Sequence, residues 1–386
     1  MLKHAFHYPA DTIYMCGHSL GPSPKIAITQ TQQALQDWSN EGVTAWNSKA
    51  WMDLPYSIAQ KIAILIGALA CEVVVSDSTS VNLYKVLRSA LFLQKNRKII
   101  LTTHDNFPAD HYIAQGITAF DQTISLQSVE PCRLIEALNE NIAVLMLTHV
   151  NFRSADVYDM QEITKAAHQF GILVIWDLSH SVGIMPIALQ ACNVDFAIGC
   201  TYKYLNGGPG SPSFIYVNQS LHDKVASPIY GWMGHQRPFA FESQFQSHGA
   251  ANYIGGTPTV LSLKALEGAL SLFEKIDLKA LYDLTLIHSN LLINALKKLN
   301  LQVITPQTKA RAGHIAIIHD AAYALSRALI EKGVICDFRE PNVIRLCINP
   351  LYLEKKDIKR CLKIFDEIIV NKIFQNPKYQ QRARVT

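Results

Sequence analysis

Four polar side chains follow two short apolar runs in the middle of the chain, and their types suit acid–base or covalent chemistry. Asp177 and His180 come after the run LVIW, and Tyr202 and Lys203 come after the run FAIGC. Both runs have the composition of buried strands, and open α/β sheets bind ligands at the carboxyl ends of their strands. The sequence therefore predicts that a carboxylate, an imidazole, a phenol and an amine share one site.

Asp177 and His180 form a DxxH pattern that is compatible with two kinds of ligand. Carboxylate and imidazole groups both bind zinc or iron, but no third ligand stands at a suitable spacing, so a metal is disfavoured. A buried carboxylate also pairs with a protonated heterocycle, and His180 would then lie over or beside the same ring. Lys203 after an apolar strand needs an ion pair or a Schiff base with a cofactor aldehyde, because an isolated buried ammonium group is costly. Together these residues favour pyridoxal 5′-phosphate.

Two further stretches could complete such a site. Ser76 to Ser80 place hydroxyl groups before a helical pattern, and a helix N-terminus binds phosphate, although an ordinary N-cap explains the same residues. The sequence has no GxGxxG or Walker-type loop, so a nucleotide is not favoured. In HDNFPADHY, Phe107 could stack on a planar ligand and Asp110 could reach the same ligand. A proline-started helix with a hydrophobic staple is the alternative.

Composition excludes several classes of protein. The chain has 386 residues, of which 49% are hydrophobic, and a formal net charge of +4 without a basic block, so nucleic acid is not an expected partner. The tail KYQQRARVT is basic, but we expect it to be a solvated end. Neither a signal peptide nor an apolar run of roughly 18 residues is present, so we expect a cytoplasmic protein without a membrane span. Eight cysteines without a CxxC pair predict buried, reduced thiols; they stand at positions 16, 71, 132, 192, 200, 336, 347 and 361.

Between residues 73 and 217, short apolar runs alternate with helical patterns, which predicts a mostly parallel α/β sheet with helices on both faces. After Leu299 the pattern changes to a smaller α+β unit. We predict an N-terminal arm over 1–22, a large domain over 23–280 and a small domain over 281–386. Strands are predicted at Val73 to Ser76, 98–102, Ile142 to Thr148, Leu173 to Trp176, Phe196 to Cys200, 213–217, 301–306, 313–319, 334–338 and 343–348. Helices are predicted from Pro24 and from Pro108, and over Ser57 to Leu69, Val81 to Leu93, Met160 to Phe170, Pro258 to Phe273, Leu278 to Leu299, Ala321 to Glu331 and Glu354 to Val370.

Several motifs, spread almost end to end, resemble those of the kynureninases, pyridoxal-phosphate enzymes of fold type I with an aspartate-aminotransferase-like large domain. The most specific are DLSHSVG, TYKYLNGGPG and GWMGH, and IYMCGHSLG, NFPADHYIA and NVIRLCINPLY are similar too. The resemblance implies hydrolysis of L-kynurenine, with 3-hydroxy-L-kynurenine as an alternative substrate. The products would be anthranilate, or 3-hydroxyanthranilate, and L-alanine, which would place the protein in tryptophan degradation.

The resemblance also implies roles for residues around the cofactor. Lys203 would hold pyridoxal 5′-phosphate covalently, and Asp177 would pair with its pyridinium nitrogen. Phe107 would stack on the ring, while Asp110 and His180 would hold its polar edge. The resemblance also implies that Thr79 and Ser80 bind the phosphate at a helix N-terminus and that Thr148 lies near the cofactor.

The resemblance further implies which residues transfer protons, bind the substrate and come from a second subunit. Tyr202 would bind the phosphate and transfer protons, and Arg345 in NVIRL would grip the substrate α-carboxylate, for which a guanidinium suits better than an amine. Trp232 and Thr257 would come from a second subunit, so a homodimer would be the functional unit. One departure concerns the arm, where the usual GNSLG is GHSLG here, with His18 in place of asparagine.

Some questions stay open on sequence alone. His18 puts the substrate contacts of the arm in doubt, including those of Ser19, and the choice between the two substrates depends on pocket residues near His235 and Trp46. Another fold type I lyase, such as a cysteine desulfurase, is an alternative, but it needs a reactive cysteine on a mobile loop. A cofactor-binding regulator without activity is the third hypothesis, which retention of the active-site lysine and arginine argues against.

Overall fold

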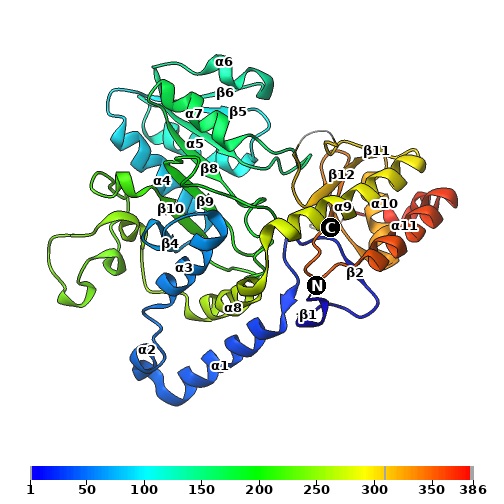
Figure 1. Ribbon diagram of the computed structural model, residues 1–386, viewed down its shortest axis with the longest axis horizontal. Coiled ribbons are helices and arrows are strands. Elements are labelled where there is room, and N and C mark those ends of the chain that lie inside the picture. Colours follow the sequence, from blue (N-terminus) through cyan, green and yellow to red (C-terminus); the bar gives the residue numbers. More distant parts are fainter. Residues whose placement is uncertain (1, 308–309, 383–386) are drawn as a thin grey trace.

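The computed structural model describes residues 2–307 and 310–382 and is built around a seven-stranded sheet (Figure 1). The strand order is β4-β10-β9-β8-β7-β5-β6, and every neighbouring pair is parallel except the two that involve β10. The mostly parallel sheet expected from the sequence is thereby confirmed. Its strands are β4 (Val73–Val75), β5 (Ile99–Thr103), β6 (Ser125–Val129), β7 (Ile142–Thr148), β8 (Leu173–Asp177), β9 (Phe196–Gly199) and β10 (Phe214–Val217).

Helices cover both faces of this sheet because its central strands are apolar on both sides. In β8, Val174 and Trp176 belong to one core cluster, whereas Ile175 between them belongs to another. The first cluster joins the sheet to α3 (Leu54–Ile66), α7 (Met160–Gln169) and α8 (Val260–Ser271), and the second joins it to α4 (Thr79–Leu93) and α5 (Pro108–Phe120). Successive side chains of a strand point to opposite faces of the sheet, so each strand packs against the helices on both faces.

A second, antiparallel sheet follows in the order β11-β12-β15-β14, seen at the opposite end of Figure 1. It carries α9 (Leu278–Lys298), α10 (Ala322–Glu331) and α11 (Lys355–Val370). The α+β character predicted after Leu299 is confirmed, and the exact domain limits stay a prediction. The strands are β11 (Gln302–Val303), β12 (His314–Ile318), β14 (Asp337–Arg339) and β15 (Val343–Cys347).

The N-terminal segment connects the two sheets. Strand β2 (Ile13–Tyr14) pairs in parallel with β13 (Val334–Ile335), and β1 (Phe6–His7) pairs with β3 (Ser23–Pro24), just before α1 (Lys25–Glu41). The single strand predicted over 334–338 is wrong, because the chain divides there between the arm and the second sheet. This division depends on contacts that are distant in sequence.

Other local differences have simple causes. Helix α3 begins three residues before the predicted Ser57, since Pro55 occupies its first turn, and it ends at Gly67, which adopts a left-handed conformation. Strand β6 was not predicted, because its sequence SLQSV is polar and it forms the edge of the sheet. Cys71 and Cys132 are exposed, so the expectation of buried thiols is wrong for these two, although all eight cysteines are free.

Within the described ranges, none of the helices combines the length and apolarity needed to cross a membrane. The last four residues of the basic tail, 383–386, lie outside the described residues. Of the rest of the tail, Lys378 and Arg382 form ion pairs with Glu331 and Glu340. This part of the tail is therefore held against the second sheet's domain.

We predict that the Trp176 indole is a support for β8, the strand that ends in Asp177. Trp176 is fully buried, and its Nε1–H donates to Thr164 Oγ1 at 3.1 Å. Thr164→Val keeps the shape but orphans this donor, so we expect the free energy of unfolding to fall by about 1–3 kcal/mol in urea titrations. Thr29→Val, at an exposed threonine of α1, is the control. Equal stability of both variants would contradict the assignment.

Candidate active site

The site is centred on Lys203, which lies in the turn after β9 with 8% of its surface exposed. Its Nζ is 3.1 Å from His180 Nε2 and lies over the rings of Phe107, at 5.7 Å, and Tyr202, at 5.8 Å. No carboxylate among the described residues comes within 4.0 Å of this amine. Lys203 is thus a buried amine surrounded by rings and without a counter-ion, an arrangement that favours a further partner.

Two buried carboxyl groups accompany the amine. Asp177 ends β8 and accepts a hydrogen bond from the Ser179 backbone N–H at 2.8 Å. Burial raises the pKa of Asp177, while the charge of Lys203 opposes that rise. Burial and then the charge of Asp177 raise the pKa of Asp110 well above its usual range. A cationic ligand beside Asp177 would therefore relieve a desolvated carboxylate.

Asn106, which the sequence analysis missed, connects these groups. Its Oδ1 accepts the backbone N–H of Thr148 at 2.8 Å, and its Nδ2 donates to Asp110 at 3.4 Å. Thr148 is the register partner of Asp177 in the parallel pair β7 and β8, so strand pairing places these two residues next to each other in the site. Phe107 precedes α5 and packs edge-to-face on Phe152, with ring centroids 5.2 Å apart. Sequence proximity to Phe107 was the only available signal for Asn106.

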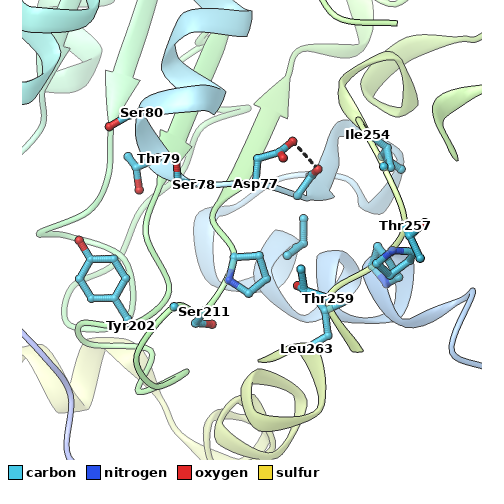
Figure 2. Close-up of a pocket in the computed structure, with 17 residues that line it drawn as sticks. Asp77, Ser78, Thr79, Ser80, Tyr202, Ser211, Ile254, Thr257, Thr259 and Leu263 are labelled. Atoms are coloured by element: carbon cyan, nitrogen blue, oxygen red, sulfur yellow. Dashed lines mark hydrogen bonds between the residues drawn. The ribbon is translucent and has the colours of Figure 1, made fainter. Parts of the chain in front are cut away.

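A cavity of about 370 Å³ opens at the N-terminus of α4 (Figure 2). Thr79, Ser80 and Tyr202 line one end of it, and Ser211 lies nearby. The backbone N–H groups in the first turn of a helix lack intrahelical acceptors, so this end suits an anion. Thr257 of the same chain lines the other end of the cavity, away from Thr79.

The Asp77 carboxylate also lines this cavity, and a buried lysine balances its charge. Lys85 Nζ pairs with Asp77 and donates to the backbone carbonyl of Tyr253 at 2.7 Å. Asp77 lies within the anion site predicted from the sequence, Ser76 to Ser80, whereas no role was predicted for Lys85. Trp232 is 41% exposed and does not line the cavity of its own chain. Its assignment to a neighbouring subunit's site stays a prediction.

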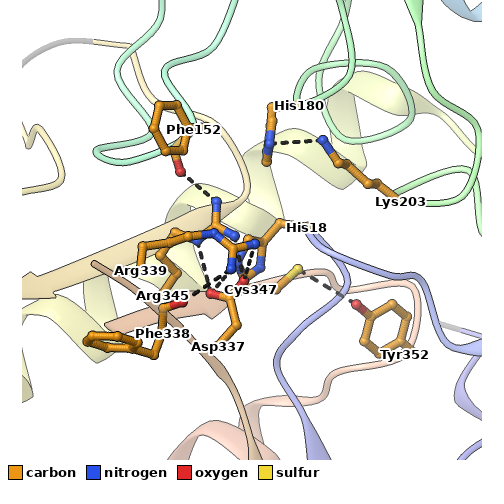
Figure 3. Close-up of polar contacts among 10 residues, drawn as sticks. All are labelled: His18, Phe152, His180, Lys203, Asp337, Phe338, Arg339, Arg345, Cys347 and Tyr352. Carbon is orange, nitrogen blue, oxygen red and sulfur yellow. Dashed lines mark hydrogen bonds and ion pairs between the residues drawn. The ribbon is translucent and has the colours of Figure 1, made fainter. Parts of the chain in front are cut away.

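Arg345 lies on β15, is 1% exposed, and forms the second centre of the site (Figure 3). Its Nε donates to Asp337 Oδ1 at 2.9 Å, its Nη2 donates to Asp337 Oδ2, and its Nη1 donates to the Phe152 carbonyl at 2.7 Å. Arg339 Nη2 lies 3.0 Å from Asp337 Oδ2. Sequence reasoning found Arg345 but missed Asp337 and Arg339, whose alternation in β14 was the only cue.

Three buried histidines lie between the two centres. His18 stacks on His314 with ring centroids 5.1 Å apart, and His314 is 5.6 Å from His180. Burial lowers the pKa of His180 well below its usual range, with Lys203 adding to the effect. Burial likewise lowers the pKa of His314, so these imidazoles are neutral at pH 7. No cluster of three or more ligands in the described part of the chain has a geometry that would hold a metal ion.

The GHSLG segment carries His18 between the two sheets because its glycines permit close approach. A Cβ atom at Gly17 would lie 2.1 Å from the Tyr352 hydroxyl, and one at Gly21 would lie 2.3 Å from the Lys203 carbonyl oxygen. The Gly21 N–H also donates to the Tyr202 carbonyl at 2.8 Å. The arm therefore packs directly on the loop that presents Lys203.

Comparison with known proteins decides the family. Residues 279–365 match the family described as the kynureninase C-terminal domain. The kynureninase of Pseudomonas fluorescens is 40% identical over 398 aligned positions, which cover all of this chain and 96% of that protein. The chain belongs to the kynureninase family. The kynureninase of Burkholderia pseudomallei strain K96243 is 36% identical with the same coverage.

Solved structures agree with this kynureninase fold. A C-DES mutant with glycine covalently linked to its PLP cofactor superposes with a TM-score of 0.85 at 18% identity, over 94% of this chain and 99% of that one. A NifS-like protein gives 0.74 at 14% identity, over 93% and 100% of the two chains. These likenesses establish the fold type I architecture, which confirms the predicted fold class.

We predict that Gly21 is required for the geometry of the kynureninase site. Gly21→Ala forces a methyl group against the Lys203 backbone, and overpacking of this kind costs about 1–3 kcal/mol, so the melting temperature should fall. Gly116→Ala, on α5, meets nothing within 4 Å and serves as the control. The account is wrong if both variants melt at the wild-type temperature.

Proposed function

We propose that the protein hydrolyses L-kynurenine to anthranilate and L-alanine with pyridoxal 5′-phosphate as its cofactor. The reaction breaks the Cβ–Cγ bond of the substrate: the oxygen of water joins the γ-carbonyl carbon, and Cβ gains a proton. Full-length kinship to kynureninases supports this activity. The observation that carries the proposal within the site is the buried Lys203 amine, which forms no ion pair with the described residues but lies near enough to Asp177 and Asp110 for its charge to lower their pKa values.

The residues present fit this cofactor. Lys203 offers an amine to an aldehyde, and the desolvated Asp177 carboxylate favours a protonated ring nitrogen. The face of Phe107 lies close to the same amine and would stack on a planar ring. The cavity at Thr79 and Ser80 suits a phosphate, and Tyr202, the neighbour of Lys203 in sequence, lines the same cavity.

When bound, the cofactor supplies a conjugated ring that takes up the electron pair released at the substrate α-carbon. Lys203 would hold the cofactor aldehyde and, as a free amine, would take the α-proton of the substrate; His180 Nε2, at 3.1 Å, and the Phe107 ring hold this amine in place. Arg345 binds the α-carboxylate and thereby orients the Cα–H bond. Burial of Lys203 and Arg345 limits the access of bulk water to both groups.

Tyr202 is our candidate for the acid that returns protons in the later steps. Burial raises the pKa of its phenol, and the neighbouring Cys200 adds to the effect. A raised pKa keeps the phenol protonated throughout the neutral and mildly alkaline range, as a proton donor requires. Tyr202 also lines the proposed phosphate cavity, so one side chain serves both binding and proton transfer.

A homodimer with shared sites is part of the proposal. The irregular segment that carries Trp232 also carries Phe239 and Phe241, and these three aromatic side chains are exposed within one chain. Exposed aromatic clusters mark interaction surfaces. Placing Trp232 and Thr257 against the phosphate cavity of a second subunit would bury this cluster and complete that cavity.

A cysteine desulfurase is not favoured, even though the fold is shared. Such an enzyme needs a reactive thiol near the lysine, and the two exposed cysteines are poorly placed. Cys71 precedes β4, at the end of that strand opposite the site, and Cys132 follows the edge strand β6, three strands from β8. Cys200 is close to Lys203, but burial raises the pKa of its thiol, which makes it a poor nucleophile.

The direct test follows anthranilate fluorescence during incubation with L-kynurenine and with its 3-hydroxy analogue. We expect wild-type protein to release the product and Lys203→Ala to lose at least about 10³-fold in rate together with the cofactor's visible absorption band. Lys224→Ala, in the turn after β10, is the matched lysine control and should retain both. Full turnover by Lys203→Ala would falsify the proposal, whereas cofactor binding without any product from wild-type protein would instead indicate a regulator.

The pH profile tests Tyr202 separately. Since the phenol pKa is raised above 10, its deprotonation cannot produce a fall in kcat between pH 7 and pH 9.5. Tyr202→Phe should lower kcat by about 10²- to 10⁴-fold while leaving any titration in this range unchanged. An alkaline limb present in wild-type protein and abolished by Tyr202→Phe would contradict this assignment.

A further inference from the structure

The Asp337 carboxylate accepts two hydrogen bonds from Arg345, the proposed substrate-binding arginine, and so fixes the orientation of its guanidinium. Three side chains donate to it: Arg345 through Nε and Nη2, Arg339 through Nη2, and His18 through Nε2 at 3.1 Å (Figure 3). Asp337 is buried, so its oxygens have no solvent to compensate for a lost donor. The rotation of this carboxylate therefore sets the plane of the Arg345 guanidinium.

His18 contributes a definite donor to this group. Burial alone would raise the pKa of Asp337, but its contacts with His18 and Arg345 hold it well below the usual range, so the carboxylate is ionised and only accepts hydrogen bonds. The proton of the neutral His18 ring must then reside on Nε2. Burial lowers the pKa of His18 to about 4, and the charge of Arg345 contributes.

His18 and Arg345 donate to the same oxygen of Asp337, because His18 Nε2 and Arg345 Nε both lie within hydrogen-bond distance of Oδ1. Two donors on one oxygen fix the carboxylate side-on to the Nε edge of the guanidinium. That arrangement leaves the N–H groups on the outer edge of Arg345 available to a ligand, apart from the one donated to the Phe152 carbonyl. A glutamine amide at position 18 would offer an N–H at a similar distance from the backbone, whereas an asparagine side chain is one bond shorter.

The arm that carries His18 is fixed at both ends. The Cys347 N–H donates to the Met15 carbonyl at 2.7 Å, two residues from Arg345, and the Gly21 N–H donates to the Tyr202 carbonyl at 2.8 Å. His18 is therefore held between the strand of Arg345 and the loop of Lys203. Its distance from Asp337 is set by these backbone contacts on either side.

We propose that His18 is a positioning residue for substrate recognition: through Asp337 it orients Arg345 for an amino acid α-carboxylate. The inference rests on the proposed function, because it assumes that Arg345 is the carboxylate site. It goes beyond that function in assigning the histidine of GHSLG a task that an amide donor at the same place can also perform. His18 itself does not touch the substrate.

The test measures ligand binding to the cofactor-loaded protein through the change in its visible absorption. L-Alanine carries the carboxylate that Arg345 would bind, and L-alaninamide lacks it. We expect His18→Ala to weaken L-alanine binding about 10- to 100-fold, the effect of losing a hydrogen bond to a charged group, and to change L-alaninamide binding less than about two-fold. His18→Gln places an amide N–H where the Nε2–H was and should recover most of the affinity.

Control variants distinguish a specific effect on the orientation of Arg345 from a general loss of structure. His288→Ala, at a buried histidine of α9 outside the site, should bind both ligands as wild-type protein does. Should His18→Ala fail to fold, His18→Phe removes the donor, keeps a ring beside His314 and gives the same selective loss for L-alanine. KM for kynurenine should rise in step with the L-alanine dissociation constant, while kcat changes less than about three-fold.

Three results would overturn the inference: no loss with His18→Ala, an equal loss for both ligands, or no recovery with His18→Gln. Arg345→Met distinguishes this failure from failure of the proposed function. If Arg345→Met weakens L-alanine binding while His18→Ala does not, only the role of His18 is wrong. If Arg345→Met has no effect, the carboxylate site itself is misassigned.

Discussion

The cost of burying an amine without a counter-ion shapes the centre of this protein. Lys203 lies among the rings of His180, Phe107 and Tyr202, and the nearest acids, Asp177 and Asp110, are themselves desolvated. Such a group is stable when its nitrogen is bound to an aldehyde carbon and the adjacent carboxylate faces a ring cation. The chain thus holds together three groups that are unfavourable alone and complementary to one cofactor.

The surrounding architecture supplies what this centre lacks. Parallel strands deliver Asp177 and the Lys203 loop to one edge of the large sheet, and the cavity at the N-terminus of α4, our proposed anion site, opens at the same edge. Arg345 comes from the antiparallel sheet, and the arm containing Gly21 and His18 joins the two. Under the proposed function, cofactor binding and substrate recognition belong to different parts of the chain, and the arm contacts both.

Much of the cofactor side could be predicted from sequence because it depends on local rules. Polar residues directly after apolar strands predicted that Asp177, His180 and Lys203 would meet, and His180 does lie 3.1 Å from the Lys203 amine. Alternation of strands and helices predicted the parallel sheet for the same reason. In each case the signal lies within a few residues, and strand order carries it into space.

The substrate side was less predictable because its contacts join distant segments. Asp337 follows a two-residue strand whose partner is the arm, so the sequence ICDFR gave no indication that it turns toward Arg345. His18 was noticed only as a departure from a motif, and its contact spans the length of the chain. Asn106 was missed because a buried amide has no periodic pattern.

The central claim is that Lys203 is the residue that binds the cofactor covalently, and reduction of the loaded protein with borohydride tests it most directly. Reduction makes the link permanent, and mass spectrometry of the digested protein then locates the added pyridoxyl phosphate group. The account predicts that the group is found on the peptide containing Lys203. Recovery of the group on a different lysine, such as the buried Lys85 beside the phosphate cavity, would contradict it.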